Sequence, residues 1–91
     1  MPRFKELLMK RNKIIEGVKV IEKVWLDGER GKTSVYFPKE MSDSEILIET
    51  KRRGYPTDSN YHYIMGETSV HVYLRKTTTN NILEIEYEAN C

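Results

Sequence analysis

Hydrophobic and polar residues alternate most regularly in the last third of the chain. Three segments show the pattern, and all are rich in β-branched and aromatic residues: 61–65, 68–75 and 82–88. Alternation with a period of two predicts strands that bury one face. The links Gly66–Glu67 and Thr77–Asn80 have turn composition. The sequence therefore predicts three consecutive antiparallel strands.

The second and third of these strands have only one acceptable register. A shift of one residue would turn the glutamates at 84, 86 and 88 into the core, where unpaired charge is costly. The pairs that avoid this are Leu74–Leu83, Val72–Ile85 and Val70–Tyr87.

The first two strands are joined by a two-residue turn, which fixes their pairing as well. The expected pairs are Met65–Thr68, Tyr63–Val70, Tyr61–Val72 and His62–His71. Tyrosine, methionine, valine and leucine side chains then share the core side. On the other side the register predicts a row of His62, His71 and Glu86, with Tyr73 beside Glu84.

Residues 2–16 have the spacing of an amphipathic helix. Pro2 suits a first helical turn and Gly17 suits a helix end. At 100° per residue, the apolar side chains fall on one face. These side chains are Phe4, Leu7, Leu8, Ile14 and Ile15.

The segment 18–26 is compatible with two structures. Val18, Ile21 and Trp25 would continue the helical period, but the abundance of β-branched residues and their alternation favour a strand. We predict that 18–26 pairs with a strand over 33–37 through a loop at 27–32.

A second helix is predicted from its two ends. Ser42 and Glu45 have the spacing of a capping box, and Gly54 followed by Pro56 marks the end. The rival interpretation is a strand over 45–50, where the residues also alternate in part. The caps at both ends favour the helix.

These elements predict an α+β fold in one domain spanning 1–91. The order is helix, hairpin, helix and a three-strand meander, which together make a five-stranded, mostly antiparallel sheet with two helices on one face. The helices would cover one side and leave the other at least partly open.

Composition limits the function classes. Hydrophobic residues make up 38% and charged residues 32%, which is typical of a soluble globular domain, and the formal net charge of +1 does not indicate a strong polyanion binder. We see no membrane-spanning segment or signal peptide, so we expect no membrane partner and a cytoplasmic location. The single cysteine, Cys91, excludes an internal disulfide.

No catalytic motif is present, and we expect neither an enzyme nor a cofactor. Neither histidine belongs to a recognisable nucleophile motif, and the spacings of structural zinc sites are absent. The only candidate metal ligands are His62, His71 and Glu86 on the predicted polar face. We interpret them as a solvated surface, because a flat sheet supplies no second layer of groups to orient ligands.

Binding through surface complementarity is therefore the preferred function, with a protein as the expected partner. Residue types that anchor interfaces occur at Trp25, Arg52, Arg53 and Tyr55, and a sheet edge could also accept a partner strand or form a homodimer. The alternative is nucleic-acid binding, in which tyrosines stack with bases and cations hold phosphates. That alternative requires Arg52, Arg53, Arg75 and Lys76 to converge with Tyr73.

Overall fold

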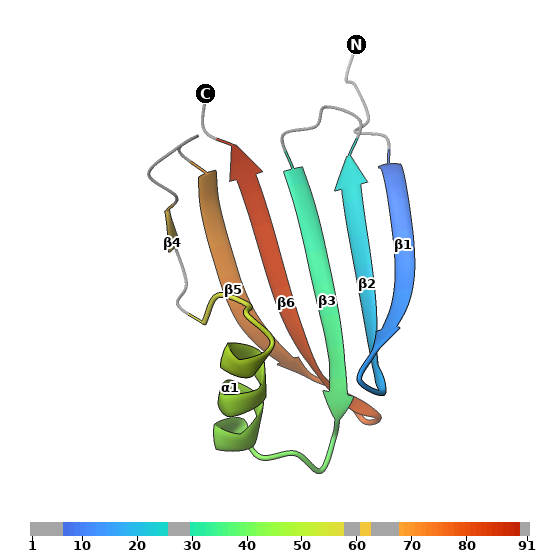
Figure 1. The fold of residues 1–91 in the computed structure, drawn as a ribbon, viewed down its shortest axis with the longest axis vertical. Coiled ribbons are helices and arrows are strands. Elements are labelled where there is room, and N and C mark those ends of the chain that lie inside the picture. The colour runs from blue at the N-terminus through green and yellow to red at the C-terminus, as the bar shows by residue number, and fades with distance from the viewer. Residues whose placement is uncertain (1–6, 26–29, 58–60, 63–67, 90–91) are drawn as a thin grey trace.

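A computed structural model of the chain describes residues 7–25, 30–57, 61–62 and 68–89. These residues form an antiparallel sheet of five long strands and a two-residue edge strand, with one helix across one face (Figure 1). The order across the sheet is β1-β2-β3-β6-β5-β4. The elements are β1 (Leu7–Ile15), β2 (Val18–Trp25), β3 (Arg30–Pro38), α1 (Asp43–Arg52), β4 (Tyr61–His62), β5 (Thr68–Lys76) and β6 (Asn80–Ala89).

The start of the chain differs most from its prediction. Residues 2–6 of the predicted helix lie outside the described residues, and in place of the rest of it Leu7–Ile15 forms β1, which pairs antiparallel with β2. Glu16 and Gly17 link these strands with φ angles of 51° and 79°. Two successive positive φ angles are typical of a type I′ hairpin turn, so Gly17 closes a hairpin and does not end a helix. The predicted α+β fold with two helices on one face is therefore wrong, and the described fold is mostly β.

The second predicted helix is confirmed as α1. The Ser42 hydroxyl accepts a hydrogen bond from the Glu45 backbone N–H at 3.2 Å. The Glu45 carboxylate accepts one from the Ser42 backbone N–H at 2.9 Å, which completes the capping box. Gly54, with φ of 82°, follows the helix as expected. The rival strand over 45–50 is excluded.

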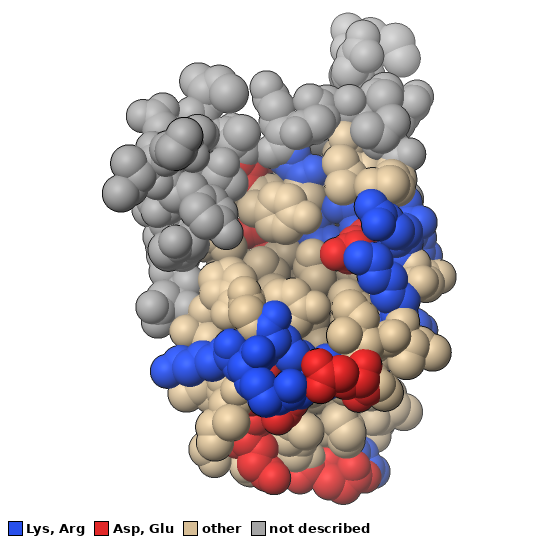
Figure 2. All heavy atoms as spheres, in the orientation of Figure 1, with Lys and Arg blue, Asp and Glu red and all other residues tan. Residues whose placement is uncertain are grey.

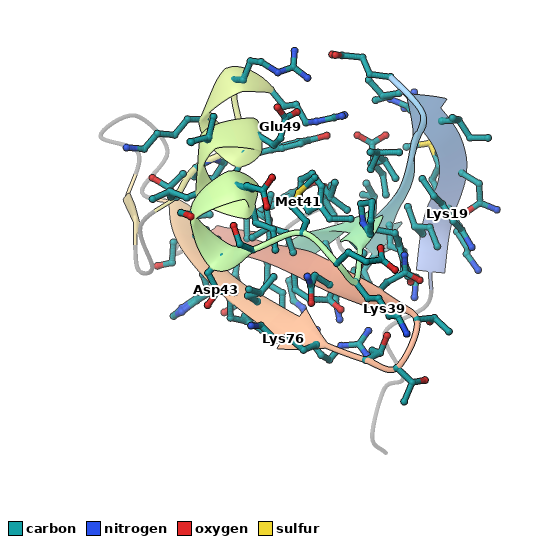
Figure 3. The ribbon with its side chains drawn as sticks, turned by 90° about the horizontal axis from the view of Figure 1, so that it is seen from below. Lys19, Lys39, Met41, Asp43, Glu49 and Lys76 are labelled. Carbon is teal, nitrogen blue, oxygen red and sulfur yellow. The ribbon has the colours of Figure 1, made fainter. Side chains whose placement is uncertain are left out.

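The core lies between α1 and one side of the sheet, which we call the helix-bearing face. The sheet curves around the helix, and Met41 points into the space between them (Figure 3). Ile46 and Thr50 are the buried residues of α1. The buried strand residues of this cluster are Val20, Val35, Phe37, Val70, Val72, Leu83 and Ile85.

The register of the later strands was predicted only in part. All three expected β5–β6 pairs are confirmed, as is the β2–β3 hairpin, although β3 already begins at Arg30 within the predicted loop. β4 pairs two residues away from its predicted position, because Tyr61 lies opposite Val70 and His62 opposite Ser69. The predictions for residues 63–67 lie outside the described residues. Strand β6 also pairs with β3, which joins the hairpin to the later strands.

A close contact between Gly31 of β3 and Tyr87 of β6 helps to join these two strands. The residues are cross-strand partners, and a Cβ at Gly31 would lie 2.2–2.7 Å from atoms of the Tyr87 ring. Only glycine allows the ring to lie against the backbone in this way.

Candidate binding surface on the open face of the sheet

The predicted binding residues Arg52 and Arg53 connect α1 to the β1–β2 turn. Arg52 bonds to the carboxylates of Glu16 at 2.7 Å and Glu49 at 2.8 Å, and Arg53 donates to the Ile15 carbonyl oxygen at 3.0 Å. The hydrogen bonds from Arg52 hold the pKa values of Glu16 and Glu49 below their usual range. Both arginines therefore already have partners within the fold.

The other predicted binding residues are divided between the two faces. Tyr55 packs against the core on the helix-bearing face, and burial raises its pKa. Lys76 pairs with Asp43 of α1 at 2.7 Å (Figure 3). Tyr73 and Arg75 occupy alternate positions on the opposite side of β5. The convergence of Arg52, Arg53, Arg75 and Lys76 that we set as a requirement is therefore not found. Acidic and basic side chains lie side by side on the helix-bearing face (Figure 2).

The opposite side of the sheet, which we call the open face, is organised around Glu84. This carboxylate is only 2% exposed. It accepts hydrogen bonds from the Ser34 hydroxyl at 2.6 Å and from Arg75 at 2.9 Å, and Lys32 lies 3.4 Å away. Burial alone would raise the pKa of Glu84, but these hydrogen bonds and the charge of Lys32 outweigh it and lower the pKa.

Of the predicted row of His62, His71 and Glu86, only His71 and Glu86 lie opposite each other on this face. His71 lies opposite Glu86 and Tyr73 opposite Glu84, as expected, whereas His62 is opposite Ser69. The Tyr73 hydroxyl donates to Glu86, and this bond raises the pKa of Tyr73 to about 12. Within the described residues, no three His, Cys, Asp or Glu side chains are grouped to hold a metal ion.

Beyond Glu86 the same row continues as three lysines. Glu86 is opposite Lys32, Lys32 is opposite Lys23, and Lys23 is opposite Lys10. We call Lys10, Lys23 and Lys32 the lysine row. Directly opposed like charges destabilise a sheet. Among the described residues, Lys32 has Glu84 as an acidic partner, whereas Lys10 and Lys23 form no ion pair.

Further cations flank the lysine row, and each lies over an aromatic ring. The guanidinium carbon of Arg30 is 5.4 Å from the Trp25 ring centroid. The Lys19 ammonium is 5.1 Å from the Tyr36 ring centroid, and Lys19 points away from α1 (Figure 3). The acidic residue within the described part of β2, Glu22, alternates onto the helix-bearing face. In the described part of the open face of β1, β2 and β3, every charged side chain is therefore basic.

A hollow of about 320 Å³ lies at one end of this basic surface. Side chains that line it from the open face come from β2, β3, β5 and β6. These are Trp25, Arg30, Lys32, Ser69, His71, Glu86 and Glu88.

Our sequence analysis named Trp25, Tyr73 and Arg75 as candidate binding residues. It did not recognise that the lysine row, Lys19, Arg30 and Tyr36 form one surface. Alternation along 18–26 and 33–37 was a usable signal for Lys19, Lys23 and Tyr36. Lys10 could not be placed beside them while residues 2–16 were assigned to a helix.

Comparison with family models, curated proteins and solved structures gave no match to this chain. No helix in the described part of the chain is long and apolar enough to cross a membrane.

Proposed function

We propose that the protein is a non-enzymatic binding domain that holds nucleic acid on the open face of its sheet. The observation that carries this proposal is the lysine row. Three lysines directly opposite one another cost stability, and two of them gain no ion pair in return within the described residues. A phosphate backbone laid across the row would neutralise this charge and release counterions. We place this activity in the cytoplasm.

The proposal reverses the preference that we drew from the sequence, where a protein partner ranked first. The residues required there for nucleic-acid binding do not converge, so the proposal depends on a different set, the lysine row with Lys19, Arg30, Trp25 and Tyr36. A surface whose charged side chains are all basic, with Trp25 and Tyr36 at its sides, combines the two features of nucleic-acid-binding sheets, namely cations for phosphates and rings for bases. The small net charge of the whole chain does not oppose this, because the charged side chains on the open face of β1, β2 and β3 are all basic in the described part of the chain.

A protein partner is the second candidate, and the edge position of β1 in the described sheet favours it. β1 is nine residues long and stands at the end of the sheet, with Ile14 79% exposed. A partner could add a strand there. A second copy of this chain fits less well, since antiparallel pairing of two β1 strands would bring Lys10, Arg11 and Lys13 of each copy together.

The test is the binding of a labelled single-stranded oligonucleotide of about 12 nucleotides, measured by fluorescence anisotropy over a salt series. We expect affinity to fall with salt, with a log–log slope that grows by about 0.7 for each phosphate contact. The double variant Lys10→Gln/Lys23→Gln should lower the slope by about 1.4. It should not lower the melting temperature, because it removes opposed like charges.

The matched control is Lys39→Gln/Lys51→Gln, which removes two exposed lysines that lie outside the open face of the sheet. It changes net charge equally and should leave the slope almost unchanged. Affinity that is independent of salt, or equal losses in the two double variants, would overturn the proposal.

A further inference from the structure

We infer that the hollow beside Trp25 binds one unpaired base of a single strand and selects bases that carry an exocyclic amino group. This inference rests on the proposed function and specifies how the same surface reads its ligand.

The Trp25 ring offers an unpaired base a surface to stack on. The Trp25 ring lines the hollow and already has the flat guanidinium of Arg30 next to it. A hollow of about 320 Å³ lies at the lower end of the size range of small-ligand sites. Aromatic rings and arginine planes are the groups on which unpaired bases stack. A paired base within a duplex would not present its flat side to this ring.

The two carboxylates in the hollow suit the edge of a base and not a phosphate. Glu86 and Glu88 line the hollow, where they would repel a phosphate. Carboxylates accept hydrogen bonds from base amino groups, as they do from N4 of cytosine. Glu88 is the freer of the two, because Arg30 lies 3.8 Å away whereas Glu86 already accepts from Tyr73. The hollow therefore suits the edge of a base, and the adjoining lysine row suits the phosphates.

The geometry of β2 suggests the path that the nucleic-acid single strand takes over the sheet. Trp25 and Lys19, which covers Tyr36, are six residues apart on β2, with Lys23 between them on the same side. At about 3.3 Å per residue, the two rings are separated by roughly 20 Å. A single strand that follows β2 would meet a ring at each end and would cross the lysine row at Lys23 between them.

The first measurement uses the unaltered protein. Trp25 is the single tryptophan of the chain, so its fluorescence reports directly on the hollow. Addition of an oligo-cytidine of about 12 nucleotides should quench this emission. Oligo-uridine of equal length, in which a carbonyl replaces the amino group, should bind at least about 5-fold more weakly.

Two variants test the two contacts separately. Trp25→Leu should weaken oligo-cytidine binding roughly 5- to 150-fold. Glu86→Gln/Glu88→Gln should bring the cytidine-to-uridine ratio of affinities close to one, because an amide also donates to the uracil carbonyl. Glu40→Gln, an exposed glutamate of the turn after β3, should leave the ratio unchanged.

The outcomes separate the two proposals. Salt-dependent binding without tryptophan quenching, or with equal affinity for cytidine and uridine, would overturn the selective hollow and leave the basic surface in place. A complete absence of oligonucleotide binding would overturn both. Equal affinity for a duplex of the same length would also contradict the single-strand assignment.

Discussion

Substituting the buried Glu84 by glutamine should destabilise the protein much more than the same change elsewhere on β6. Glutamine has the shape of glutamate but only one acceptor oxygen, so its amide NH2 would face either Ser34 or Arg75, both of which donate to Glu84. Each hydrogen bond to a charged group contributes about 1.5–3 kcal/mol. The Arg75 side chain is 51% exposed and regains water, so its share is smaller. The expected loss is about 2–4 kcal/mol.

The assay is urea denaturation followed by circular dichroism, with Glu88→Gln as the matched control. Glu88 lies on the same strand and face, but its side chain is 58% exposed and its contact with Arg30 is long at 3.8 Å. The control should lose no more than about 0.5 kcal/mol. The Glu84→Gln midpoint should fall by roughly 1–3 M urea relative to the unaltered protein.

The pH dependence provides a second criterion. The pKa of Glu84 is lowered in the folded protein, so its ionised form stabilises the fold fully above the pKa of the unfolded chain, about 4.3. That contribution is lost as the pH falls below this value toward the folded pKa. The stability difference between parent and Glu84→Gln should therefore shrink under acid. A difference that stays constant with pH, or one no larger than that of Glu88→Gln, would refute the reasoning.

Three further predictions concern single contacts. Gly31→Ala should cost about 1–3 kcal/mol, measured by thermal denaturation, and most of this should be regained with Tyr87→Leu, which removes the clashing ring. Ser42→Ala should cost about 1 kcal/mol through loss of the helix cap, whereas Ser42→Asp should cost less; equal losses would contradict the capping role. The phenol of Tyr73 should titrate near pH 12 by ultraviolet absorbance, and Glu86→Gln should move it toward 10; an unchanged value would exclude the hydrogen bond as the cause.

Local signals predicted α1 correctly because its determinants are local. Ser42, Glu45 and Gly54 act within one turn of each helix end, so no distant residue is needed to recognise them. The β5–β6 register was also predictable, since a shift would have buried three glutamates. One of them, Glu84, is buried nevertheless, on the open face, because Ser34 and Arg75 supply the partners that make this tolerable.

The structure of β1 was not predictable from periodicity alone. Leucine and isoleucine at 7, 8, 14 and 15 fit a helical stripe, but pairing with β2 through the Glu16–Gly17 turn determines the outcome. An edge strand that carries cations on both faces of the sheet lacks the regular alternation of hydrophobic and polar residues that identified the other strands. The basic surface was missed for the same reason, because it exists only once β1 lies beside β2.

The pairing of β3 with β6 has a consequence for how the chain reaches its native state. Ser34 and Glu84, which bond across this pair, are 50 positions apart, whereas β1–β2, β2–β3 and β5–β6 each join neighbouring segments. Two sheet fragments can thus form early and independently, and their union at the β3–β6 seam requires closure of a long loop. We expect formation of this seam to limit the folding rate. Once the seam has formed, the hydrogen bond between Ser34 and the carboxylate of Glu84 should stabilise it.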